Sequence, residues 1–169
     1  MTVIAYKDGI MACDSSWTDD HGTCQTLLNK ITRLSSGALL GEAGDCDSRS
    51  MHVILDKVKC FDKMPLNEEI AKAKVDYAAL LVFPNGEVCM VTCDHDEKAG
   101  WRGQAWKLNR GFATCGSGAD IALGFMGAGK SAAEACAFVC RFADGCRLPI
   151  HSVPLKPTKK VPRAPSRRR

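Results

Sequence analysis

Short apolar runs separated by turn residues open the chain. Residues 3–6 (VIAY) and 10–13 (IMAC) flank a Lys-Asp-Gly turn, a pattern that predicts a β-hairpin. Further on, residues 30–34 alternate between polar and apolar, and a new apolar run begins at Ala38 after a Ser-Ser-Gly turn. We therefore expect two consecutive hairpins near the N-terminus.

The middle of the chain changes from helical to strand-like spacing. An apolar pattern with helical intervals begins at Met51 and ends at Val58, and a weaker one covers residues 66–75. A nearly continuous apolar run at 77–83 then leads through Pro-Asn-Gly into a second run at 87–92. Two such runs around a tight turn are a strong hairpin signal.

The remaining segments complete the expected set of elements. The polar residues Cys93 to Asp96 are expected to form a solvated loop. The pattern predicts short strands at 105–108, 112–115 and 150–153, and helices at 117–128 and 131–142. Hairpins take the place of alternating strand–helix units, which favours antiparallel sheets with helices packed outside them, an α+β fold.

Length and composition are typical of one globular domain. The chain has 169 residues, of which 46% are hydrophobic and 25% charged, enough to bury a substantial core. No stretch approaches the roughly 20 apolar residues that span a bilayer, and the first residues resemble no secretory signal. We expect a cytoplasmic protein that makes no membrane contact.

Charge separates a basic tail from this domain. Residues 156–169 contain seven Lys or Arg and no acid, so removing their charge from the net charge of +4 leaves −3 for the rest. Five of the seven prolines also follow residue 148. We therefore divide the chain into a domain at 1–154 and a disordered, basic, proline-rich tail at 155–169. The tail could contact nucleic acid or another acidic surface, but simple solvation is the favoured interpretation.

The ten cysteines give little support for a metal site. They are scattered without a Cys-x-x-Cys pair, and the four histidines lie far apart. We expect most cysteines to be reduced and to act as small core residues. We expect neither a metal nor a cofactor.

Residues 124–131, GFMGAGKS, match the phosphate-binding pattern G-x-x-x-x-G-K-[ST] at every fixed position. A true phosphate loop of this kind joins a buried strand to a helix. Here the preceding residues 116–123, GSGADIAL, are typical of a helix start, and Ser131 is suited to cap the next helix. We interpret the match as accidental, and a P-loop nucleotide-binding protein is the least favoured alternative.

Thr2 is the strongest candidate for chemistry. Methionine is usually removed before a small second residue, which would leave a threonine with a free α-amine. Such a residue carries both a nucleophile and a base, because the hydroxyl can attack while the amine takes its proton. The α-amine has a reference pKa of about 8, which suits a base at neutral pH.

Four sequence segments, taken in order, support Thr2 as a candidate nucleophile. TVIAYKDGIMACD, NKITRL, ALLGEAGD and CGSGADIAL together resemble the proteasome β-subunit family, especially HslV-type peptidases and small proteasome-like proteins of bacteria and phages. The resemblance runs from Thr2 to about Ile150. It implies a four-layer αββα N-terminal-nucleophile sandwich of two antiparallel sheets between helix layers. It also implies threonine-type hydrolysis of peptide bonds.

The resemblance implies catalytic roles for three residues. Thr2 would be the nucleophile once Met1 is gone. Lys30 would place a cation near its hydroxyl and favour the ionised form, and Asp14 would pair with Lys30 and hold it in place. The plainer interpretation of Lys30 and Asp14 is an ordinary ion pair at strand ends.

The resemblance also implies roles for other residues around these three. The backbone N–H of Gly44 would stabilise the oxyanion, Gly41 would let a substrate backbone approach, and Ser117 would hydrogen-bond the Thr2 amine. Gly44 could instead form a plain turn, and Ser117 could merely cap a helix. The supporting acid on the loop after the last helix would be Asp144, one position away from the family pattern, with Arg147 where a small residue is usual.

The resemblance also implies partners. Relatives assemble into homo-oligomeric rings, often stacked, which take peptides or unfolded proteins, and some depend on an ATP-dependent unfoldase. A rival interpretation is a catalytically inactive, ring-forming scaffold of the same fold, which the altered loop around Arg147 supports.

Overall fold

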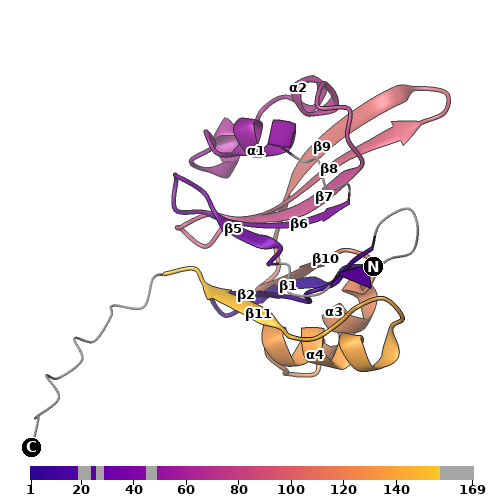
Figure 1. The fold of residues 1–169 in the computed structure, drawn as a ribbon. Helices are drawn as coiled ribbons and strands as arrows, with labels where there is room; N and C mark the ends of the chain where they lie inside the picture. The colour runs from indigo at the N-terminus through magenta and orange to yellow at the C-terminus, as the bar shows by residue number, and fades with distance from the viewer. Residues whose placement is uncertain (19–23, 26–28, 45–48, 157–169) are drawn as a thin grey trace, which may run out of the picture.

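A computed structural model describes residues 1–18, 24–25, 29–44 and 49–156 of the chain. Two antiparallel sheets form its centre (Figure 1). The four-stranded sheet has the order β10-β1-β2-β11, with β10 at Phe112–Cys115, β1 at Ile4–Lys7, β2 at Ile10–Cys13 and β11 at His151–Pro154. The five-stranded sheet has the order β5-β6-β7-β8-β9, with the strands at Ile31–Arg33, Leu39–Gly44, Tyr77–Val82, Val88–Asp96 and Gly100–Leu108. A further two-stranded pair joins β3 (Trp17–Thr18) to β4 (Cys24–Gln25).

Helices cover the outer face of each sheet. On the five-stranded sheet lie α1 (Arg49–Leu55), the short 3₁₀ turn η1 (Phe61–Lys63) and α2 (Asn67–Ala71), and on the four-stranded sheet lie α3 (Ala119–Gly127) and α4 (Ala132–Phe142) (Figure 1). The layers are therefore helix, sheet, sheet and helix. This confirms the predicted α+β fold with a four-layer αββα arrangement.

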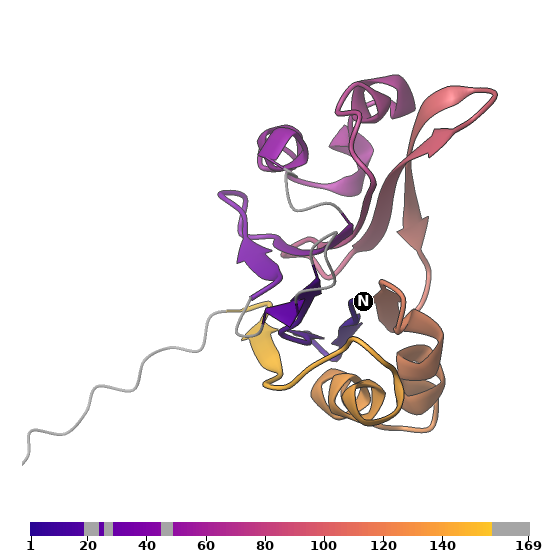
Figure 2. The same cartoon turned by 45° about the vertical axis from the view of Figure 1, so that its right-hand side comes forward.

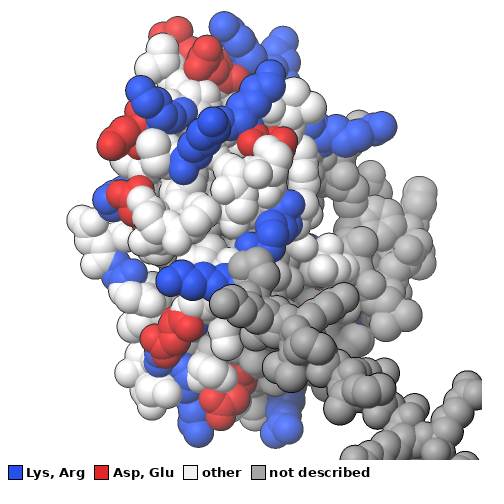
Figure 3. All heavy atoms as spheres, turned by 90° about the vertical axis from the view of Figure 1, so that its left-hand side faces the viewer, with Lys and Arg blue, Asp and Glu red and all other residues white. Residues whose placement is uncertain are grey.

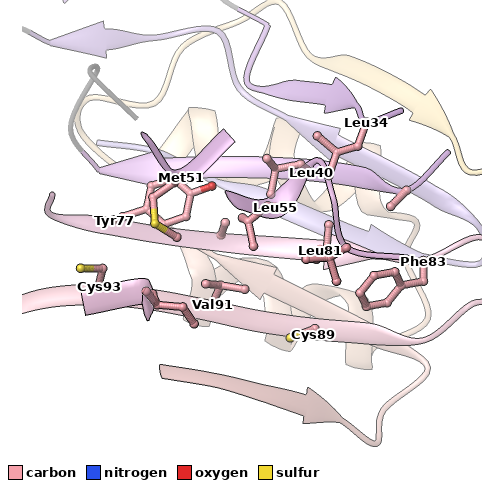
Figure 4. Close-up of a cluster of buried hydrophobic side chains, with 14 of the residues drawn as sticks. Leu34, Leu40, Met51, Leu55, Tyr77, Leu81, Phe83, Cys89, Val91 and Cys93 are labelled. Atoms are coloured by element: carbon pink, nitrogen blue, oxygen red, sulfur yellow. The ribbon is translucent and has the colours of Figure 1, made fainter. Parts of the chain in front are cut away.

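Alternation along the strands supplies the three interfaces between these layers. On β1, Ile4 and Tyr6 pack between the sheets, whereas Ala5 faces α3 and α4. On β7, Leu80 lies between the sheets and Leu81 packs under α1 and α2 (Figure 4). Because both faces of β7 are covered, its sequence is apolar almost throughout rather than alternating. Each such buried leucine contributes about 1.5–3 kcal/mol of burial free energy.

The second half of the long hairpin differs from its prediction. Residues 93–96 were expected to form a solvated loop, but they continue β8, and β9 begins at Gly100. Cross-strand contacts explain the extension, because Arg102 pairs with Asp94 at 2.9 Å and the rings of His95 and Trp101 meet edge to face. The polar composition reflects an exposed strand and not a loop.

The phosphate-loop match lies between two helices. Residues 124–127 belong to α3, Gly129 has φ +92° in the turn, and Ser131 caps α4 by accepting a hydrogen bond from the Glu134 N–H at 3.3 Å. The Lys130 ammonium pairs with Glu134 at 3.7 Å. No strand precedes the first glycine of the match, so the strand–loop–helix context of a phosphate loop is absent from this part of the described chain.

The C-terminal boundary lies near its predicted place. Leu155 is buried in the core between the sheets, and its N–H donates to the Gly9 carbonyl at 2.7 Å. Packing therefore includes Leu155, the first residue of the predicted tail, while residues 157–169 lie outside the described part of the chain. The face drawn in Figure 3 carries lysine and arginine side chains interspersed with acidic ones. Among the described residues, no helix is long and apolar enough to cross a membrane.

Candidate active site

The backbone of Thr2 is fixed just before the start of β1, an inner strand of the four-stranded sheet. The next residues form β1, which pairs with β2 on one side and β10 on the other. The Thr2 carbonyl accepts a hydrogen bond from the Gly118 N–H at 3.0 Å. Gly116 has φ +91°, and a Cβ there would lie 2.4 Å from the same carbonyl oxygen, so glycine is required at this position. Figure 2 shows the N-terminus beside the segment that joins α4 to β11.

Three predicted residues meet at the Thr2 hydroxyl. The Lys30 Nζ donates to Thr2 Oγ1 at 2.8 Å and contacts Asp14 Oδ1 at 2.7 Å. Asp14 directly follows β2, and Lys30 directly precedes β5, so the ion pair bridges the two sheets. Both side chains are almost fully buried. An ammonium ion in this position favours the ionised form of the hydroxyl.

Asp14 is held by more donors than the lysine alone. Its Oδ1 also accepts from the Val3 N–H at 3.0 Å, and its Oδ2 accepts from the N–H and the hydroxyl of Ser16 at 3.0 and 2.5 Å. Burial alone would raise the pKa of the Asp14 carboxyl, but the hydrogen bonds from Lys30 and the other donors outweigh it and lower the pKa. Asp14 is therefore an anion at neutral pH and keeps Lys30 in place.

Ser117 lies at the nitrogen of Thr2. The Thr2 N–H donates to Ser117 Oγ at 3.1 Å, and Ser117 Oγ lies 3.4 Å from the Thr2 carbonyl oxygen. The serine precedes α3 by two residues, and its hydroxyl caps no N–H of that helix. The alternative role as a helix cap is therefore not realised.

Ser16 was missed by the sequence analysis. It is fully buried, and its hydroxyl contacts Asp14 Oδ2, the Gly145 carbonyl and, at 3.3 Å, the Met1 carbonyl. Three polar residues in a row after an apolar strand read as a loop, and nothing in one sequence distinguishes a buried serine from a solvated one. The adjoining Ser15 is also fully buried, with its N–H on the Arg147 carbonyl at 2.9 Å.

The other predicted site residues stand apart from this cluster. Asp144 is exposed, and within the described chain it forms no hydrogen bond or ion pair with Thr2. The loop turns at Gly145, with φ +91°, and presents the Gly145 carbonyl to Ser16 in place of the Asp144 carboxylate. The predicted support of the free Thr2 amine by Asp144 stays a prediction.

Gly41 and Gly44 both lie on β6, but different structural constraints require glycine at each position. A Cβ on Gly41 would lie 2.7 Å from Ile4 Cγ2 and 2.8 Å from Met11 Sδ, so Gly41 faces the opposite sheet and pairs with strands on both sides. Its role beside a substrate backbone stays a prediction. Gly44 ends β6 with φ +112°, and a Cβ there would lie 2.3 Å from the Asp76 carbonyl. Its role at the oxyanion stays a prediction.

A second polar cluster lies one strand away from Lys30. Glu42 on β6 donates its backbone N–H to the Lys30 carbonyl at 3.0 Å. Its carboxylate accepts a hydrogen bond from the Tyr77 hydroxyl at 2.9 Å and contacts His52 Nε2 on α1. Burial and the nearby Glu42 raise the pKa of Tyr77 well above its ordinary value, so this hydroxyl stays a neutral donor.

The thiols take no part in this chemistry. The cysteines described with their side chains are free, and most are buried, as expected for small core residues. Burial raises the pKa of Cys13 to about 11 and of Cys115 to about 12, so both remain protonated and unreactive at neutral pH. Among the described residues, no group of three or more His, Cys, Asp or Glu is placed to hold a metal ion.

The chain has a four-layer αββα fold with a cluster of polar side chains at Thr2. Solved structures of two proteins are similar to it: an Anbu mutant from Hyphomicrobium sp. strain MC1 and Anbu, an ancestral beta-subunit, from Yersinia bercovieri. The first has a TM-score of 0.57 and the second 0.54, each at 10% identity over 91% of this chain and 81% and 82% of the other chain, respectively. These similarities establish the shared fold.

The comparisons also correct the predicted family. No protein-family model matches the chain, and no curated protein matches it. Assignment to the proteasome β-subunit and HslV-like threonine peptidase family is therefore wrong as a sequence relationship, since the likeness to Anbu is one of structure at 10% identity.

Proposed function

We propose that the chain is an N-terminal threonine hydrolase that cleaves peptide bonds through an acyl-enzyme on Thr2, once Met1 has been removed. The observation that carries this proposal is the position of Lys30 Nζ, 2.8 Å from Thr2 Oγ1 and 2.7 Å from Asp14 Oδ1. A threonine hydroxyl is a weak nucleophile at neutral pH and needs an adjacent base or cation to react. A buried ammonium ion meets part of that need.

The free amine of Thr2 would supply the base. In the first half of the reaction, Thr2 Oγ1 attacks the carbonyl carbon of the peptide bond while the amine takes the hydroxyl proton and passes it to the leaving amine. In the second half, the same amine removes a proton from water, which attacks the ester. Ser117 Oγ, 3.1 Å from the Thr2 nitrogen, would orient this amine, and the Gly44 N–H is proposed to donate to the oxyanion.

The peptidase is proposed to work inside a homo-oligomeric ring. The description of a structural neighbour as an ancestral beta-subunit supports an assembly of like subunits. A chamber would restrict access to peptides and unfolded chains, and an ATP-dependent unfoldase would then feed folded proteins. Native mass spectrometry of the purified protein tests the assembly, since a single monomeric species would contradict it.

A catalytically inactive scaffold of the same fold is the second candidate. It is supported by the exposed position of Asp144, which leaves the Thr2 nitrogen without a nearby carboxylate from that loop. A scaffold would assemble normally but leave Thr2 unreactive.

Hydrolysis of peptides separates the two candidates. The purified protein, with Met1 loss verified by intact mass, is incubated with fluorogenic peptides and with an unfolded protein substrate. We expect turnover that is abolished in Thr2→Ala and retained at a reduced rate in Thr2→Ser, because serine keeps the hydroxyl. Equal turnover in Thr2→Ala and the wild type would overturn the proposal.

A further inference from the structure

The Met1 side chain packs against the loop after α4, next to Thr2. A Cβ on Gly145 would lie 3.0 Å from Met1 Cβ and 3.2 Å from Met1 Cγ, so the methionine side chain rests directly on this glycine. The Met1 carbonyl lies 3.3 Å from Ser16 Oγ. About half of the Met1 surface is covered, with 49% exposed. We call the place formed by Ser16 and Gly145 the Met1 seat.

The Met1 seat is held by contacts that do not involve Met1. The Ser16 hydroxyl contacts the Gly145 carbonyl, and the Ser15 N–H donates to the Arg147 carbonyl at 2.9 Å. The hydroxyl of Ser15 also donates to the Pro149 carbonyl. These bonds tie the loop after α4 to the end of β2, so its shape is expected to persist when Met1 is removed.

We propose that the vacated Met1 seat binds the residue on the leaving side of the scissile bond. The inference rests on the proposed function. The base that takes the proton from the Thr2 hydroxyl must deliver it to the leaving amine, so that amine must lie next to the Thr2 nitrogen. Met1 is the residue joined to this nitrogen, and its removal opens space at that point.

The walls of the Met1 seat set the chemistry of its ligand. Its floor is backbone at Gly145, where an added Cβ would lie only 3.0 Å from the Met1 Cβ, so little room remains beside that atom. A β-branched side chain would place a further heavy atom at this contact, whereas an unbranched chain can follow the path of the methionine. The preferred leaving residue therefore carries an unbranched apolar side chain, such as methionine.

Acyl transfer to added amines tests the preference. The acyl-enzyme is formed from an ester substrate and is partitioned between water and an amino acid amide. During capture the amine attacks the ester carbonyl, the C–N bond forms as the C–O bond to Thr2 breaks, and the proton of the attacking amine returns to Oγ1 through the Thr2 amine. We expect methioninamide and norleucinamide to capture the acyl group about tenfold more efficiently than valinamide, in line with discrimination by small apolar groups.

Two glycine variants provide the matched comparison. Gly145→Ala places a methyl group in the Met1 seat, whereas Gly86→Ala imposes the same backbone strain, at φ +88° against +91°, with nothing within 4 Å. Gly145→Ala should form the acyl-enzyme and lose the preference for methioninamide, and Gly86→Ala should keep the preference.

The outcomes distinguish this inference from the proposed function. An acyl-enzyme that transfers equally to all the amides would overturn the Met1 seat as a subsite alone. Absence of any acyl-enzyme on the free Thr2 would overturn both.

Discussion

Two carboxylates near Lys30, the buried Asp14 and the half-buried Glu42, have different surroundings. Asp14 is paired with the Lys30 ammonium and bridges the two sheets, and its pKa is lowered. Glu42 binds the Tyr77 hydroxyl and His52, and it connects the five-stranded sheet to α1. Only the first cluster touches the Thr2 hydroxyl. A cation held in place by an anion suits a nucleophile, whereas the second cluster joins a helix to its sheet.

The largest effect is expected from replacing Lys30, which breaks its ion pair with Asp14. Lys30→Met should slow acylation of Thr2 by about a thousandfold, within the range lost with an acid–base group. It also leaves Asp14 buried without its cation, which costs about 3–5 kcal/mol of unfolding free energy. Acylation kinetics by mass spectrometry and urea unfolding measure the two effects.

Lys107→Met is the matched control for this change. Lys107 pairs with Glu87 on the surface, with 42% of its side chain exposed. Its loss should leave acylation unchanged and alter stability far less than Lys30→Met does. Equal effects of the two variants would contradict a special role for Lys30.

The next effect is a change in how stability depends on pH. The pKa of Asp14 in the folded protein lies below its ordinary value of 3.8, so the carboxylate stabilises the fold above that pH. This stabilisation disappears as the pH falls through the lower folded value. Asp14→Asn should therefore be clearly less stable than the wild type at pH 7, and the difference should shrink toward pH 3.

Urea unfolding at the two pH values measures this difference. Asp94→Asn, which removes an exposed partner of Arg102, serves as the control and should change stability little at either pH. A destabilisation by Asp14→Asn that is the same at pH 7 and pH 3 would contradict the assignment of Asp14 as a native-state anion.

A smaller effect is expected at the other carboxylate. Glu42→Gln keeps an acceptor for the Tyr77 hydroxyl but removes the charge beside His52, so we expect a loss of about 1–2 kcal/mol in unfolding free energy. Acylation of Thr2 should fall less than tenfold, because Glu42 contacts Lys30 through a backbone hydrogen bond. A loss of acylation as large as that of Lys30→Met would show that the two clusters act as one.

The smallest effect is expected at the phosphate-loop match. Lys130→Ala removes an exposed contact with Glu134 and should leave both stability and acylation within experimental error. Isothermal titration with Mg-ATP should detect no binding by the wild type or the variant. Binding by the wild type that is lost in Lys130→Ala would revive the nucleotide-binding alternative.

Most of the fold could be predicted from the sequence because the patterns that indicate its strands, turns and helices are local. Alternation and turn residues located the hairpins of β1 with β2 and β7 with β8, and helical spacing located α3 and α4. The extension of β8 through Cys93–Asp96 was missed because its support comes from β9, and exposed paired strands look like polar loops. The tight packing of Gly41 against Ile4 and Met11 was missed because the close approach of two sheets is invisible in either strand alone.

The candidate site was predictable where a residue type has a distinctive chemistry. Thr2, Lys30, Asp14 and Ser117 were each named beforehand, and the structure brings them together. Ser16 carried no such signal, because its importance lies in being buried between Asp14 and Gly145. Asp144 was chosen as the only acid in its loop, but the turn at Gly145 directs it outward. Contacts made by backbone carbonyls leave little trace in the sequence.

The central claim is that Thr2 becomes a nucleophile with its own amine as base. A peptide epoxyketone, which can react with both the hydroxyl and the amine of one residue, tests it most directly. Intact mass should show loss of Met1 and a single adduct, peptide mapping should place it on Thr2, and Thr2→Ala should form none. A protein that has lost Met1, is correctly folded and still forms no adduct at Thr2 would contradict the account.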